Sequence, residues 1–251
     1  MTNNQDVTEL VFIIDKSRSM SGLESDTIGG FNSMIAKQKK EKGKTIVSTV
    51  LFSTEFELIH DRIDIGDIKK MTGKQYSVGG CTALLDAVGT TVDRIRRRQE
   101  DDEEKVKTTL VVIITDGYEN SSAEYTYSNI KRLIDRQKEN GWDFLFMGAN
   151  IDVAAEARKM GIRRENSVSY CCDTEGIAEM YSTVDAKLCM PGRRALSTPM
   201  NEREGTQSLS HISRSPPSKG SCRLFPGMYS LIFSRDLTRR IAPRTDSTIR
   251  G

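Results

Sequence analysis

The chain has 251 residues, of which 37% are hydrophobic, and a formal net charge of +2. That length allows one or two domains, and no stretch approaches the run of about 18 apolar residues that a membrane-spanning helix needs. Residues 1–9 are polar and lack the apolar segment of a secretory signal, so the sequence predicts a cytoplasmic protein without a membrane partner.

The first half of the chain reads as alternating strands and helices. A strand is predicted at 9–14, followed by a helix at 26–42 with an apolar stripe formed by Ile28, Phe31 and Ile35. Strands are predicted at 45–52 and 56–63. Because three residues between them cannot make a parallel crossover, the second is expected to be an antiparallel edge strand.

The second half continues the alternation. Thr82 is expected to open a helix, and a fourth strand is predicted at 109–115. The remaining predicted elements are a helix at 127–139, a strand at 143–147, a helix capped by Asp152 that ends near Gly161, a strand at 167–170, and a closing helix with Ile177, Met180, Tyr181 and Val184 on one stripe. This order is typical of a doubly wound α/β fold, a mostly parallel sheet with helices on both faces.

Two of the predicted strands run directly into an aspartate. The first strand ends in Asp15 and the fourth in Asp116, and ligands of open α/β sheets bind beyond the carboxyl ends of such strands. Hydroxyl groups accompany these carboxylates at Ser17 and Ser19, with a third candidate at Thr82. An all-oxygen set of this kind suits Mg²⁺ better than Zn²⁺. The sequence therefore predicts a site for a divalent cation at this edge of the sheet.

These residues resemble the metal-ion-dependent adhesion site of the von Willebrand factor A domain family. The D-x-S-x-S motif of that family matches Asp15, Ser17 and Ser19, its separate threonine matches Thr82, and its second aspartate matches Asp116. The resemblance covers about residues 8–185 and is greatest to stand-alone intracellular bacterial members. One departure is Arg18, since many relatives have glycine there.

The resemblance implies a six-stranded sheet of order 3-2-1-4-5-6 that holds Mg²⁺, with Mn²⁺ as a substitute. In that order the first and fourth strands are neighbours, so Asp15 and Asp116 are expected to meet, and repulsion between the two charges is expected to raise one pKa. The family's mode of action implies that a partner protein supplies a Glu or Asp carboxylate to the metal. Lys16 is expected to have an exposed side chain in the loop between these elements.

The function that follows is metal-dependent protein binding without catalysis. One alternative is a Mg²⁺-dependent hydrolase, but the two histidines, His60 and His211, fall in the edge-strand region and the C-terminal part, away from the predicted site. A second alternative is a scaffold subunit of a stress-response or metal-insertion assembly that works with an ATPase. The five cysteines lack paired C-x-x-C spacing and are expected to be free thiols: Cys81, Cys171, Cys172, Cys189 and Cys222.

The C-terminal part differs in composition from the rest. All six prolines follow residue 190, and residues 186–251 contain 12 Lys and Arg against 4 Asp and Glu. We therefore predict a domain over 1–188 and a basic Pro/Ser/Arg-rich tail over 189–251. The tail is either a disordered basic arm or the product of a lost coding frame, and its shift from lysine to arginine favours the second. Nucleic-acid binding is expected, if anywhere, only there.

Overall fold

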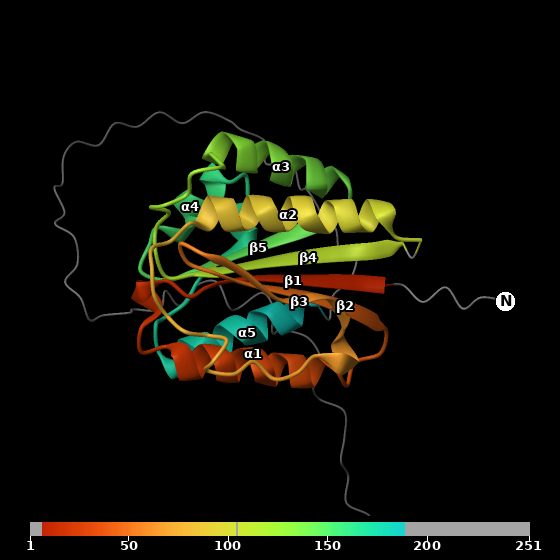
Figure 1. Ribbon diagram of the computed structural model, residues 1–251, viewed down its shortest axis with the longest axis horizontal. Coiled ribbons are helices and arrows are strands. Elements are labelled where there is room, and N and C mark those ends of the chain that lie inside the picture. The colour runs from red at the N-terminus through yellow and green to blue at the C-terminus, as the bar shows by residue number, and fades with distance from the viewer. Residues whose placement is uncertain (1–6, 104, 189–251) are drawn as a thin grey trace, which may run out of the picture. The chain divides into compact units, whose positions relative to one another are not determined.

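The computed structural model describes residues 7–103 and 105–188, which form a sheet flanked by helices (Figure 1). The strands are β1 (Val7–Asp15), β2 (Lys44–Phe52), β3 (Phe56–Asp64), β4 (Val106–Thr115), β5 (Trp142–Gly148) and β6 (Ser167–Ser169). The α-helices are α1 (Glu24–Gln38), α2 (Leu84–Asp101), α3 (Tyr127–Glu139), α4 (Val153–Lys159) and α5 (Thr174–Leu188). Short 3₁₀ helices occur at η1 (Arg18–Met20), η2 (Ile65–Asp67) and η3 (Arg164–Asn166).

The six strands form one sheet in the order β3-β2-β1-β4-β5-β6. Only the β2–β3 pairing is antiparallel among the described strands, which confirms the predicted doubly wound fold and its antiparallel edge strand. Asp15 pairs in register with Phe52, so the carboxyl ends of β1 and β2 lie side by side. The reversal of strand order between β1 and β4 creates the crevice in which ligands of such sheets bind.

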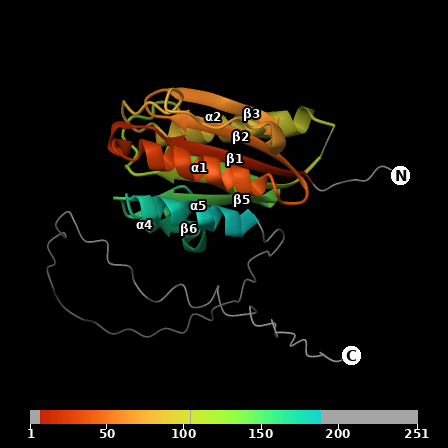
Figure 2. The ribbon, with the colours of Figure 1, turned by 90° about the horizontal axis from the view of Figure 1, so that it is seen from below.

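Helices cover both faces of the sheet. Helices α1 and α5 lie on one face, whereas α2, α3 and α4 lie on the other (Figures 1 and 2). Successive side chains of β1 lie on opposite faces of the sheet. Phe12 packs with apolar residues of α1 and α5, and Ile13 packs with apolar residues of α2 and α3. Burial on both faces explains why β1 and β4 are continuous apolar runs instead of alternating ones.

The predicted elements are all present, with shifted boundaries. The expected stripe of the closing helix is buried at all four positions: Ile177, Met180, Tyr181 and Val184. Asp152 caps α4 as predicted, because its carboxylate accepts the Ala155 amide at 3.0 Å. The first helix was predicted too long, since α1 ends at Gln38 and residues 39–42 form a turn. Its last four predicted residues are exposed lysines and a glutamate, which bury no apolar face that would stabilise a helix there.

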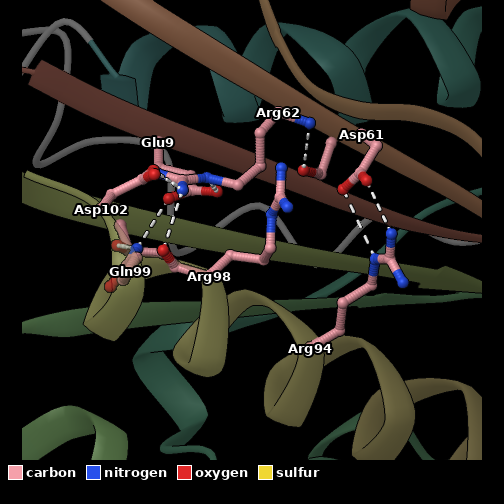
Figure 3. A network of polar contacts seen from close by, with 9 residues as sticks. Glu9, Asp61, Arg62, Arg94, Arg98, Gln99 and Asp102 are labelled. Carbon is pink, nitrogen blue, oxygen red and sulfur yellow. Dashed lines mark hydrogen bonds and ion pairs between the residues drawn. The ribbon is translucent and has the colours of Figure 1, made fainter. Parts of the chain in front are cut away.

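A network of charged residues lies at the opposite edge of the sheet, where β1 begins (Figure 3). The fully buried Glu9 accepts hydrogen bonds from Arg62 at 2.9 Å and Gln99 at 2.7 Å. Arg62 also pairs with Asp102, so it ties β1, β3 and the end of α2 together. The neighbouring pair of Arg94 and Asp61 is more exposed, at 43% and 32% of the two side chains.

Among the described residues, no helix is long and apolar enough to cross a membrane. Cys81 is a free thiol, in agreement with the prediction for this residue. The predicted tail over 189–251, with Cys189, Cys222 and His211, lies outside the described residues.

Candidate metal centre

Asp15 ends β1 and lies at the centre of the predicted site. Its carboxylate is fully buried and accepts the Ser17 amide at Oδ1, 2.6 Å away, and the Thr115 hydroxyl at Oδ2, also 2.6 Å away. Thr115 is the last residue of β4, so this second bond joins the carboxyl ends of the two central strands. Thr115 was missed by the sequence reasoning, although it directly precedes Asp116.

The three hydroxyl groups and Asp116 form a continuous hydrogen-bonded cluster. Thr82 donates to Ser17 at 3.1 Å, the Ser17 and Ser19 hydroxyls are 3.0 Å apart, and Ser19 donates to Asp116 at 2.5 Å. Ser17, Thr82 and Asp116 are buried, whereas Ser19 is exposed. The fold thus brings together all five residues that the sequence predicted as ligands, although Asp15 and Asp116 belong to distant parts of the chain.

Loops that the sequence did not mark as functional hold Thr82 in place. The Thr82 amide donates to the Asn120 side chain at 2.9 Å, and the Asn120 amide donates back to the Thr82 carbonyl at 3.1 Å. Glu119 accepts the Leu85 amide at 2.9 Å, at the beginning of α2. The segment after β4 therefore fixes the position of the threonine.

Space for a small ligand among the hydroxyls depends on a glycine. A Cβ atom at Gly117 would stand 3.3 Å from both the Ser19 and the Thr82 hydroxyl oxygens. A side chain here would therefore fill the cradle between these two donors. Two carboxylates and three hydroxyls form the hard, oxygen-only set that Mg²⁺ and Mn²⁺ prefer. Among the described residues, no group of three or more His, Cys, Asp or Glu side chains is placed to hold a metal ion.

Burial perturbs both carboxyl groups. Removal from water raises the pKa of Asp15 to about 6, and the hydrogen bonds from Thr115 and Ser17 oppose this shift. The charge of Asp116 raises the pKa of Asp15 least among the causes, so the expected mutual repulsion is a minor effect. Burial likewise raises the pKa of Asp116, against its bond from Ser19. A divalent cation would compensate the cost of holding these two buried charges.

Tyrosines support the backbone beneath the cluster. The buried Tyr76 hydroxyl donates to the carbonyl of Asp15 at 2.5 Å, and Tyr170 donates to the carbonyl of Thr115 at 3.3 Å. Tyr76 belongs to the irregular connection between β3 and α2, which has no apolar periodicity. Sequence reasoning had no signal by which to assign it to the site.

The chain matches a known protein family over more than half of its length. Residues 9–182 match the family model of the von Willebrand factor type A domain. The chain belongs to this family. Among curated protein sequences, none matches the chain.

Solved structures of other proteins share the fold at low sequence identity. Proximal thread matrix protein 1 from the mussel byssus is 16% identical with a TM-score of 0.55, over 75% of this chain and 48% of that one. The TRAP protein of Plasmodium vivax, loaded with manganese, is 17% identical with a TM-score of 0.50, over 70% and 72%. A von Willebrand factor type A protein from Catenulispora acidiphila is 14% identical with a TM-score of 0.51, over 73% and 42%.

These matches show the shared fold. The chain spans about half the length of the mussel protein. A further structure of that mussel protein has zinc in its adhesion-site motif, with a TM-score of 0.53 and 14% identity over 75% of this chain and 47% of that one.

The two basic residues within the D-x-S-x-S motif of this von Willebrand factor A domain, Lys16 and Arg18, differ in exposure. Lys16 was predicted to be exposed, but this prediction was wrong: Lys16 is 9% exposed, and its ammonium group pairs with Glu57 of β3 at 2.8 Å. The pairing depends on the position of β3 beside β2, which the local sequence does not reveal. Arg18 is exposed, and its amide donates to the Gly80 carbonyl at 3.2 Å.

His60 lies away from the metal centre of the domain. It is buried on β3 and stacks on Phe31 of α1, with ring centroids 6.2 Å apart. Burial lowers its pKa, so the imidazole is neutral at pH 7. It belongs to the packing between the edge strand and α1.

Proposed function

We propose that the chain is a Mg²⁺-dependent protein-binding module, with Mn²⁺ as a substitute, which holds the cation through Asp15, Ser17, Ser19, Thr82 and Asp116. The observation that carries this proposal is the convergence of five oxygen-bearing side chains from three separate loops into one hydrogen-bonded cluster. Gly117 leaves space between two of them.

The partner contact follows from the charge of the site. Two carboxylates balance a divalent cation, and the hydroxyls add no charge. A bound cation would therefore supply a coordination position for an acidic side chain from outside, while the protein residues orient that position. We propose that the partner is a protein that offers a Glu or Asp at this point, that the module acts in the cytoplasm as a stand-alone bacterial-type domain, and that it has no catalytic activity.

The test is capture of binding proteins on the immobilised full chain, in Mg²⁺ and in chelator. The Asp15→Ala/Asp116→Ala variant serves as the matched control surface. Proteins retained only by the unchanged chain in Mg²⁺ are identified, and the acidic residue at the contact is replaced by its amide. We expect both the chelator and the amide to abolish retention. Retention that persists in chelator would contradict the proposal.

A hydrolase is the competing function, because a carboxylate beside a metal can accept a phosphoryl group. The position of His60 on β3, stacked on Phe31, leaves it outside the metal centre and counts against a role as base there. Metal-dependent phosphatase turnover that disappears in Asp15→Ala would favour the hydrolase. A scaffold role beside an ATPase would instead show an ATPase among the captured partners.

A further inference from the structure

Two exposed aromatic side chains lie at the same edge of the sheet as the metal centre. Among the described residues, the large apolar side chains classed as exposed are Phe56, at 40%, and Tyr118, at 50%. Aromatic residues are enriched at protein interfaces, where they form buried anchors. Their position beside the metal centre, and not scattered over the surface, suggests that they contact whatever binds there.

The fold places these aromatics on opposite sides of the centre. Phe56 begins β3 and pairs with Phe52, which itself pairs with Asp15, so Phe56 lies two strands from the centre on the β3 side. Tyr118 follows Asp116 by two residues, and its hydroxyl accepts the amide of Asp152 at 2.9 Å, toward β5 and α4. At about 4.8 Å per strand, the two rings flank the centre over roughly 15 to 20 Å.

A positive charge lies between the two rings. Arg18 stands between the donors Ser17 and Ser19, and its exposed side chain has no hydrogen bond or ion pair with the described residues. Two further carboxylates near this edge are already engaged, Glu57 with Lys16 and Glu119 with backbone amides of the loop that follows it. With the charges of Asp15 and Asp116 balanced by a divalent cation, Arg18 places a positive charge directly beside the centre.

We propose that Phe56, Arg18 and Tyr118 form a recognition surface around the metal centre. It takes an extended protein segment in which the metal-bound acidic residue has apolar side chains on both sides and a second acidic residue that pairs with Arg18. At about 3.3 Å per residue, the distance between the rings corresponds to roughly five or six residues. This inference rests on the proposed function, because the central carboxylate is the one that coordinates the cation.

The experiment is selection of displayed random dodecapeptides on the full chain in Mg²⁺, with release of bound peptides by chelator. We expect released peptides to contain two acidic residues with apolar residues on either side. In parallel selections, Arg18→Ala should lose the preference for the second acidic residue. Phe56→Ser and Tyr118→Ala should each lose the apolar preference on one side.

An enriched peptide is then synthesised and its affinity measured by fluorescence anisotropy. Each of the three substitutions should weaken binding about tenfold, as expected for an interface anchor. A matched control should bind like the unchanged chain: Arg163→Ala removes an exposed arginine, 65% accessible, that precedes η3 and β6. The metal-induced rise in melting temperature should persist in every variant, which shows that each one is folded and loaded.

The outcomes separate the two proposals. Released peptides with one acidic residue and no preference beside it, or three variants that bind like the unchanged chain, would overturn the recognition surface and leave metal-dependent binding intact. No chelator-released peptide would overturn the proposed function, and the surface with it.

Discussion

Replacing Asp15 by asparagine should stabilise the metal-free protein while it abolishes the response to metal. Burial raises the pKa of Asp15 from 3.8 to about 6, so ionisation of this group at neutral pH lowers the free energy of unfolding. At about 1.36 kcal/mol per pH unit, the shift corresponds to roughly 3 kcal/mol. The hydrogen bonds from Ser17 and Thr115 are already included in this net shift. We therefore expect a gain of about 3 kcal/mol, or roughly 6 to 12 °C in melting temperature.

The amide fits the same hydrogen-bonding geometry. Its oxygen can accept the Ser17 amide, and its nitrogen can donate to the Thr115 hydroxyl, which in turn can donate to the Gly117 carbonyl 3.1 Å away. In excess Mg²⁺ the order should reverse. The unchanged chain gains about 4.1 kcal/mol at a thousandfold excess over Kd, whereas the variant gains nothing.

The raised pKa of Asp15 also predicts how the stability of the metal-free chain changes with pH. Because the folded state binds the Asp15 proton more tightly than the unfolded state, the metal-free chain should lose stability as the pH rises from about 4 to about 6. The asparagine variant lacks this group, so the difference between the two proteins should vanish near pH 4 and reach its full size above pH 6. Urea unfolding across this range is the assay. A variant less stable than the unchanged chain at pH 7.5 without metal would refute the reasoning.

Three further substitutions have expected outcomes with matched controls. Arg62→Ala leaves the buried Glu9 without its cation and should lower the free energy of unfolding in urea by about 3 to 5 kcal/mol. Arg94→Ala breaks a more exposed ion pair and should lower it by under about 1 kcal/mol. Equal losses would contradict the difference in burial between the two pairs. Tyr76→Phe leaves the Asp15 carbonyl without its donor and should cost about 1 to 3 kcal/mol. Tyr181→Phe removes a buried hydroxyl that has no hydrogen-bond partner among the described residues, so it should be neutral or stabilising. Gly117→Ala places a methyl group against the Ser19 and Thr82 hydroxyls and should weaken Mg²⁺ binding, measured by calorimetry, about tenfold. The free energy of unfolding should fall by under about 1 kcal/mol. Unchanged Mg²⁺ affinity would show that the cation does not use this space.

The arrangement of strands and the five candidate ligands could be predicted because both leave local signals. Strands buried on both faces are continuous apolar runs, and β1 and β4 each run into an aspartate at the edge where ligands bind. Thr82 lies outside any such run and was assigned through the family resemblance. The sheet order then followed, and with it the meeting of Asp15 and Asp116.

What could not be predicted depends on contacts between distant segments. The pairing of Lys16 with Glu57 requires the register of the edge strand, and the support from Tyr76 comes from a connection without periodicity. The main cause of the raised pKa of Asp15 is burial, which depends on how all the surrounding loops close over the site. Local sequence reports chemistry at a position, but not the depth at which the fold places it.

Calorimetric titration of Mg²⁺ into the full chain tests the central claim most directly, namely that five converging oxygen donors hold one divalent cation. We predict one ion bound per chain, and no detectable binding to the Asp15→Ala/Asp116→Ala variant, which should still unfold cooperatively. The far-side variant Arg94→Ala should bind like the unchanged chain. Binding of one ion by the double variant with unchanged affinity would contradict the account.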